Sequence, residues 1–169
     1  GQSNAMRYDL GGRMIEHVDN DGVTTTHTYD GVGNLIARQA DDEPAETAVR
    51  SPGGKRIRYE DARGVETWAY NSRDLVSQHS TADGDRIEWE YDLMDRLISR
   101  TDPTGVTHYE YDAGSRLIAV RDPDGGITTY TYTLGGSQQS VTYPNGVVTH
   151  YEFNASQQLT RTFSEDADG

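Results

Sequence analysis

The sequence contains no cysteine and few of the large aliphatic residues from which most protein cores are built. Without cysteine the chain can form no disulfide, no thiolate metal site and no cysteine nucleophile. Leu, Ile, Val and Phe together number 28 of 169 residues, and the net charge is −13. This composition approaches that of disordered chains. The 11 tyrosines and two tryptophans argue against disorder, because they recur in register and offer large rings for packing.

Long apolar runs and basic surfaces are missing as well. No apolar stretch approaches the roughly 18 residues of a membrane-spanning helix, and the first residues do not have the pattern of a signal peptide. The acidic balance disfavours nucleic acid and anionic membranes as partners. Residues 1–5, Gly-Gln-Ser-Asn-Ala, look like an expression-tag remnant. We therefore assign a single repeat array to residues 6–169 and expect the chain to be a segment of a larger protein.

Four columns of residues recur with a period of 20 or 21 residues. Successive anchor aromatics are 21, 41, 21, 20, 21 and 21 residues apart, and the interval of 41 spans two periods. One degenerate copy, near residues 43–64, has therefore lost its anchor. A polar residue directly follows each anchor, an apolar residue often lies six after it, and glycine lies fourteen after five of the seven anchors. A fixed period in several columns is the signature of a tandem repeat. The anchors are Tyr8, Tyr29, Tyr70, Tyr91, Tyr111, Tyr132 and Phe153.

Each copy has the pattern of a β-hairpin with two tight turns. Residues two apart in a strand point to the same face, so Tyr109 and Tyr111 predict an aromatic face that neighbouring copies would stack into a core. Asp112 is suited to cap a turn, and Gly114 to adopt positive φ within it. In Asp102-Pro-Thr-Gly105, Pro and Gly occupy the second and fourth positions of another turn. The prediction is an all-β fold of tandem hairpins of about 21 residues, forming a curved or spiralling antiparallel sheet.

Two places depart from this pattern. The acidic, proline-containing stretch from Asp41 to Glu46 predicts a surface loop. In the copy anchored at Tyr132, Gln138 and Gln139 replace the usual apolar pair. The return strand of that copy is therefore expected at a sheet edge or facing solvent.

The sequence predicts neither an enzyme nor a cofactor site. Aspartates that recur at one turn position are typical of backbone capping, and the five histidines lack the spacing of metal ligands. Weak Ca²⁺ binding at Asp19 and Asp21, or at Asp122 and Asp124, stays open, although the distal Glu of a calcium loop is missing. The predicted site residues are therefore structural repeat positions, with no catalytic residue, cofactor ligand or metal ligand among them. These positions are Tyr8, Asp9, Tyr29, Asp30, Trp68, Tyr70, Trp89, Tyr91, Asp92, Tyr109, Tyr111, Asp112, Tyr130, Tyr132, Tyr151 and Phe153.

The pattern Gly-x-x-x-x-Tyr-x-Tyr-Asp-x-x-Gly-Arg-Leu, fullest between Gly105 and Ile118, resembles the YD repeat, also called the RHS repeat. About seven to eight copies extend from Arg7 to Phe163, with Thr133 and Asn154 departing from the usual Asp. The family includes bacterial RHS and wall-associated polymorphic toxins, toxin-complex B and C components, and teneurins. The resemblance implies a β-sheet that spirals into a hollow shell around a toxin domain, with structural rather than catalytic repeat positions.

The expected function is thus a non-catalytic segment of a shell that encloses or presents a toxin or other cargo domain of a larger secreted or surface bacterial protein. Its partners would be the neighbouring repeats and the enclosed cargo. An isolated segment is expected to self-associate through its exposed sheet edges. The alternative is a module that binds carbohydrate or a cell surface through exposed Tyr and Trp rings, with a glycan as partner.

Overall fold

A computed structural model describes residues 4–166, in which every regular element is a β-strand. The all-β prediction is thus confirmed. No helix in this range is long and apolar enough to cross a membrane. The chain divides into two compact units, Gly1–Arg86 and Ile87–Gly169. Of the predicted tag remnant, residues 1–3 lie outside the described range, whereas Ala5 begins the first strand and pairs with Val18.

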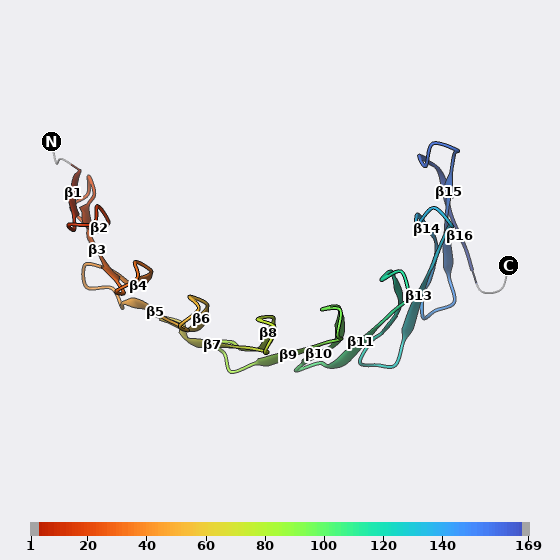
Figure 1. Ribbon diagram of the computed structural model, residues 1–169, viewed down its shortest axis with the longest axis horizontal. Helices are drawn as coiled ribbons and strands as arrows, with labels where there is room; N and C mark the ends of the chain where they lie inside the picture. Colours follow the sequence, from red (N-terminus) through yellow and green to blue (C-terminus); the bar gives the residue numbers. More distant parts are fainter. Residues whose placement is uncertain (1–3, 167–169) are drawn as a thin grey trace. The chain divides into compact units, whose positions relative to one another are not determined.

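The first unit contains eight strands, each antiparallel to its neighbours in the sequence (Figure 1). Odd-numbered strands end in the anchor residue, and even-numbered strands return from it. The strands are β1 (Ala5–Tyr8), β2 (Met14–Val18), β3 (Thr24–Tyr29), β4 (Leu35–Ala40), β5 (Glu46–Arg50), β6 (Arg56–Asp61), β7 (Gly64–Tyr70) and β8 (Val76–Ser80).

The second unit repeats this arrangement, and its first strand begins at the boundary between the units. Its strands also lie in chain order and pair antiparallel. They are β9 (Arg86–Tyr91), β10 (Leu97–Asp102), β11 (Gly105–Tyr111), β12 (Leu117–Arg121), β13 (Ile127–Tyr132), β14 (Gln138–Thr142), β15 (Val148–Phe153) and β16 (Leu159–Glu165).

The turn after each anchor, here called the aspartate turn, has the same backbone geometry in all eight hairpins. In the hairpin of β11 and β12, the Asp112 N–H donates to the Arg116 carbonyl (2.9 Å) and the Ser115 N–H donates to the Asp112 carbonyl (3.0 Å). Just before the turn the register shifts, because Glu110 pairs with Ala119 but Tyr111 pairs with Leu117. This is a hairpin loop closed by a β-bulge, in which one residue must adopt positive φ.

The prediction that Gly114 adopts this positive φ is wrong. The residue in the left-handed region is Ser115, at φ 63°, one position later. The same position, four after the anchor, has positive φ in every aspartate turn, and it is glycine in only some of them. Where it is not glycine, the turn imposes a conformation that costs an L-residue of order 1 kcal/mol. These non-glycine residues are Asp74, Asp95, Ser115 and Gln157.

The turn between β10 and β11 follows the prediction for Asp102–Gly105. Asp102 pairs directly with Gly105, so only Pro103 and Thr104 lie between the strands. Gly105 has φ 130°, and a Cβ there would lie 2.7 Å from Pro123 Cβ, so glycine is required on two grounds. Asp41–Ala45 forms the connection before β5, and its first four residues are exposed, as predicted for an acidic loop, whereas Glu46 already belongs to β5.

The degenerate copy forms a complete hairpin from β5 and β6. Arg50 occupies the anchor position, and Ser51 takes the place of the aspartate. Gly54 adopts positive φ at 81°. The aspartate turn therefore forms without either of the residues that define the other copies.

Burial is low throughout the described residues, and the prediction of a buried aromatic core is wrong there. Val141 is the single buried hydrophobic residue, at 4% exposure, and no large side chain is fully buried. Anchor rings such as Tyr111 and Tyr132 are half-buried. Each unit is a single sheet without a second layer, so a ring can be covered by its neighbours but keeps one open side.

The strand predicted to lie at an edge or to face solvent is instead the most buried of the second unit. β14 lies between β13 and β15, and it contains both Ser140 and Val141, the latter paired with Tyr130 and Thr149. Gln138 and Gln139 mark only the start of this strand, where the bulge occurs. A polar pair beside the bulge therefore says nothing about the burial of the residues that follow it.

Candidate functional site: the seam between repeat copies

The side chain after the anchor organises its own turn. Asp112 Oδ1 accepts hydrogen bonds from the N–H groups of Gly114 (2.8 Å) and Arg116 (2.9 Å), and Oδ2 accepts one from Arg116 Nε (2.7 Å). Asp9 makes the same three contacts with Gly11 and Arg13. A side chain that accepts two turn N–H groups replaces hydrogen bonds that the short loop cannot supply from its own backbone.

These hydrogen bonds favour the ionised carboxylate. The backbone and then the side chain of Arg116 hold the pKa of Asp112 below its usual value. The backbone and then the side chain of Arg13 lower the pKa of Asp9 in the same way. In Asp30 the side-chain amide of Asn34 has the largest effect in lowering the pKa. An acid that is held ionised by its own turn is suited to structure and not to proton transfer.

Four anchor tyrosines form a hydrogen bond to the copy before their own. The hydroxyl of Tyr111 donates to the carbonyl of Leu97, at 2.9 Å, and Leu97 lies six residues after the preceding anchor. The anchors whose hydroxyls reach that same position are Tyr29, bonded to Met14 (2.8 Å), Tyr70, bonded to Arg56 (2.9 Å), and Tyr132, bonded to Leu117 (2.6 Å).

A basic side chain from the preceding aspartate turn covers the same rings. The guanidinium carbon of Arg96 lies 4.8 Å from the centroid of Tyr111, and that of Arg116 lies 4.9 Å from Tyr132. Arg13 over Tyr29 (5.0 Å) and Lys55 over Tyr70 (4.8 Å) are equivalent. Such cation–π contacts contribute about 0.5–1 kcal/mol at exposed sites. We call these contacts, together with the tyrosine hydrogen bonds, the seam.

The seam differs from the expected stacking of aromatic pairs. The ring stacks found within residues 4–166 include histidine, with Trp68 lying 4.8 Å from His79 and Phe163 lying 5.0 Å from His150. Behind Trp68, His79 Nε2 contacts Glu66 at 2.9 Å. A tyrosine ring therefore interacts with a cation and a carbonyl from the neighbouring copy, and not with the next tyrosine.

The remaining predicted positions fall into two groups. The residues two before the anchor are half-buried, and each faces a residue of the return strand. Burial raises the pKa of Tyr130, whose partner across the strands is Val141. At the start of the chain Tyr8 is 54% exposed. The residues two before the anchor are Trp68, Trp89, Tyr109, Tyr130 and Tyr151. The second group consists of the anchors and the aspartates that directly follow them: Tyr8, Asp9, Tyr29, Asp30, Tyr70, Tyr91, Asp92, Tyr111, Asp112, Tyr132 and Phe153.

In both loops considered for Ca²⁺ binding, an aspartate carboxylate oxygen accepts hydrogen bonds from backbone N–H groups. Asp19 Oδ1 accepts from the N–H groups of Asp21 (2.9 Å) and Val23 (3.0 Å). Asp122 Oδ1 accepts from Gly126 at 2.6 Å. In the part of the chain that the structure describes, no three His, Cys, Asp or Glu side chains converge as metal ligands would.

Sequence reasoning missed the basic residue of the seam. Arg13, Lys55, Arg96 and Arg116 all lie five residues after an anchor position, so a fifth column was readable. Its partner is the anchor of the following copy, about sixteen residues away, and only the pairing of strands brings the two together.

Comparison with known proteins identifies what the repeat is similar to. The RHS Repeat family model matches residues 8–43, 70–107 and 91–127, which together cover more than half of the chain. No curated protein sequence matches it. Among solved structures, the chain is similar to the crystal structures of TcdB2-TccC3 (TM-score 0.75, 18% identity) and TcdB2-TccC3-Cdc42 (TM-score 0.72, 17% identity). It is also similar to the Tc holotoxin pore of Photorhabdus luminescens (TM-score 0.74, 18% identity).

These matches cover 95–98% of this chain but 10% of each of those chains. At this level of identity they show a shared fold, and the chain spans about a tenth of the length of the structures it matches.

Proposed function

Because the chain belongs to the RHS repeat family, we propose that this structural repeat scaffold is a wall segment of a β-sheet shell that encloses or presents a toxin or other cargo domain. The parent would be a larger secreted or surface protein, and the segment itself would be non-enzymatic. The predicted repeat positions would then be structural. The seam is the observation that carries this proposal, because at four junctions it adds side-chain contacts to the strand pairing between copies without using a second layer.

A wall requires a sheet that holds together while both of its faces stay open. In a two-layered domain, burial between layers provides most of the stability. Here consecutive copies are joined by strand pairing, as between β10 and β11, and at four junctions the seam adds a hydrogen bond and a cation–π contact, as between Tyr111 and the copy containing Leu97 and Arg96. Both faces of the sheet then remain available, one for contents and one for the surroundings.

Exposed apolar residues at the tips of the aspartate turns support a larger assembly. Leu10 and Leu134 are each 110% exposed, and Leu93 is 97% exposed. A further turn of the wall would cover these leucines. The solved structures that share this fold are toxin-complex components about ten times longer than this chain.

Protection of the cargo tests the proposal. In the parent protein, a domain inside the shell should resist a protease that digests the same domain when it is expressed alone. Tyr111→Ala combined with Tyr132→Ala should open the seam and expose the cargo, whereas Tyr130→Phe should leave it protected. Cargo that is digested at the same rate inside the intact parent and alone would contradict enclosure.

The isolated chain offers a second test. β1 and β16 each pair with one neighbour within the described residues, so each leaves an edge open for pairing. We expect concentration-dependent self-association in size-exclusion chromatography with light scattering. A strict monomer at high concentration would contradict this part of the proposal.

A further inference from the structure

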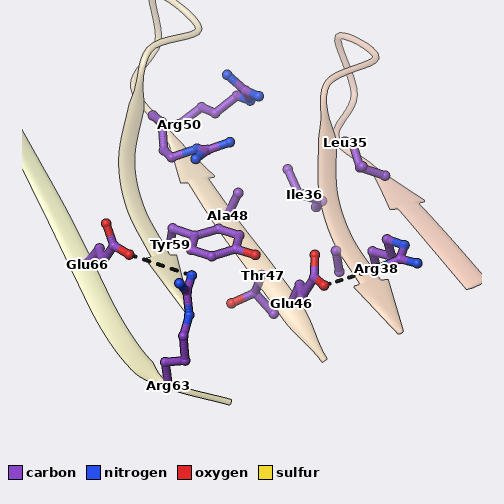
Figure 2. A pocket seen from close by; sticks show the side chains of 12 residues that line it. Leu35, Ile36, Arg38, Glu46, Thr47, Ala48, Arg50, Tyr59, Arg63 and Glu66 are labelled. Carbon is purple, nitrogen blue, oxygen red and sulfur yellow. Dashed lines mark hydrogen bonds and ion pairs between the residues drawn. The ribbon is translucent and has the colours of Figure 1, made fainter. Parts of the chain in front are cut away.

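A hollow of about 390 Å³ lies over the degenerate copy, where both aromatic columns of the first unit are interrupted (Figure 2). Ala48 stands two before the anchor position, where Trp68 stands in the next copy, and Arg50 stands at the anchor itself. The missing rings leave space that Leu35 and Ile36 of β4 line from one side and Tyr59 of β6 lines from the other.

Four arginines line this hollow, and two of them are neutralised by ion pairs. Arg38 lies 3.1 Å from Glu46, and Arg63 lies 2.7 Å from Asp61 and 4.0 Å from Glu66. Figure 2 shows Arg38 beside Glu46 and Arg63 linked to Glu66, while Arg50 lies above Tyr59 and away from both pairs. The hollow thus has a polar, balanced end and an end with uncompensated positive charge.

The uncompensated charge belongs to Arg50 and Arg56. They face each other across β5 and β6, an arrangement in which like charges repel. Neither forms an ion pair within the described residues. Arg50 Nη1 donates to the Gly54 carbonyl at 2.8 Å, but its Nε is buried and has no acceptor. The guanidinium carbon of Arg56 lies 5.0 Å from the centroid of Tyr59, so an aromatic ring and not a carboxylate is its neighbour.

This concentration of positive charge stands out in an acidic chain. Five of the 15 Lys and Arg residues fall between Arg50 and Arg63, although the net charge of the chain is −13. A bound oxyanion would offset the repulsion between the facing guanidinium groups of Arg50 and Arg56. Guanidinium groups match the oxygens of phosphate and carboxylate in charge and in geometry.

We propose that the hollow binds a small organic anion through its phosphate or carboxylate group. Arg50 and Arg56 hold the oxyanion through the N–H groups of their guanidinium groups. The body of the ligand lies against Tyr59 and Ile36, and the hollow lies within the size range of about 300–1,000 Å³ typical of small-molecule sites. The site does not depend on whether the repeats enclose a cargo.

Titration of the chain with inorganic phosphate and with phenyl phosphate tests this site. We expect saturable binding of one equivalent by calorimetry, together with a shift of the Arg50 Nε–H signal in ¹⁵N NMR spectra. Phenyl phosphate should bind more tightly than inorganic phosphate, because its ring can contact Tyr59. Sodium acetate, titrated in parallel, shows whether the site prefers a phosphate or a carboxylate.

Two substitutions should weaken binding of both phosphates at least tenfold: Arg50→Gln and Arg56→Gln. Arg58→Gln is the matched control, since it removes the same charge from the same strand but on the face opposite Tyr59, where Arg58 pairs with Glu60. Binding that is unchanged in Arg50→Gln, or equally weakened in Arg58→Gln, would overturn the proposal.

Ala48→Tyr separates the hollow from its charge. It keeps all four arginines and restores the aromatic residue that other copies have at this position, so the protein should fold. It should abolish binding of phenyl phosphate by filling the space. Thermal melts establish that each variant is folded, and wild-type affinity in folded Ala48→Tyr would contradict a site within the hollow.

Discussion

The degenerate copy of β5 and β6 and the fullest copy of β11 and β12 form the same hairpin from different residues. Their turns close with nearly identical hydrogen bonds, from Ser51 N–H to the Lys55 carbonyl (2.8 Å) and from Asp112 N–H to the Arg116 carbonyl (2.9 Å). They differ in what the anchor reaches. Tyr111 bonds to the preceding copy, whereas Arg50 bonds within its own turn. The hairpin is therefore a local property, and the anchor ring adds a side-chain contact to the strand pairing between copies.

The residue of the preceding aspartate turn that would cover the degenerate anchor also differs from its equivalents in other copies. Four anchor tyrosines are each covered by a basic residue of the preceding aspartate turn, as Tyr111 is by Arg96. Before Arg50 the equivalent position holds Asn34, whose side chain instead donates to Asp30 at 2.8 Å. An arginine there would face another arginine, so both ends of the seam differ together in this copy.

Removing an anchor ring should produce the largest difference between the two copies. Tyr111→Ala deletes a half-buried ring, its hydrogen bond to Leu97 and the contact with Arg96, and should lower the free energy of unfolding by about 3 kcal/mol. Arg50→Ala removes no ring and should cost less than about 1 kcal/mol. Urea unfolding of both variants measures the difference, and equal losses would show that the anchor column is not the connecting element.

The turn side chains should give the next largest contrast. Asp112 accepts three hydrogen bonds, whereas Ser51 Oγ accepts one, from the Lys55 N–H at 3.2 Å. Asp112→Ala should therefore lower the melting temperature more than Ser51→Ala, but less than Tyr111→Ala. A larger effect at Ser51 would mean that the degenerate turn depends on its capping residue more than the complete turn does.

Removing only the hydroxyl of Tyr111 separates the effect of its hydrogen bond from that of its ring. Tyr111→Phe keeps the ring and the contact with Arg96 but loses the hydrogen bond to Leu97, at a cost of about 1 kcal/mol. Tyr130→Phe is the control, because no hydrogen bond from its hydroxyl occurs among residues 4–166. If denaturant unfolding gave the same stability for both phenylalanine variants, the hydroxyl would not contribute to the seam.

Acid should affect the complete turn and spare the degenerate one. The backbone and side chain of Arg116 lower the pKa of Asp112 in the folded state. Its contribution to stability is thus complete above the unfolded pKa of about 3.9 and disappears as the pH falls through the lower folded pKa. In NMR spectra, the backbone amide signals of Gly114 and Arg116 should shift with a midpoint below about pH 4. The amide signal of Lys55 should not shift in this range. A midpoint above the pKa of an ordinary aspartate would contradict a lowered pKa of Asp112 in the folded state.

The repeat period was enough to predict the strands and the order in which they pair. Apolar and polar alternation in β11, where Tyr109 and Tyr111 are half-buried and Glu110 is exposed, follows directly from the geometry of a strand. The position of positive φ did not follow. Gly114 can adopt it, but the hydrogen bonds of the turn place it at Ser115, and glycine content alone does not reveal which residue a turn selects.

The seam and the hollow needed the structure for a different reason. Arg96 and Tyr111 are close because β10 pairs with β11 and the aspartate turn places its basic residue above the next ring. A sequence column shows that a residue recurs but not what it contacts. The hollow is harder still to predict from the sequence, because it arises where Ala48 and Arg50 stand in place of aromatic rings. In a repeat sequence, such replacements look like degeneration of the repeat and not like a binding site.

Transplanting the seam into the degenerate copy tests most directly whether the anchor ring and its basic partner form a portable connection. Asn34→Arg and Arg50→Tyr together would reproduce the pair formed by Arg96 and Tyr111. We expect the double variant to be more stable than the sum of the single variants predicts, by about 1 kcal/mol in a double-mutant cycle of urea unfolding. Strict additivity, or a double variant less stable than the sum predicts, would contradict the account.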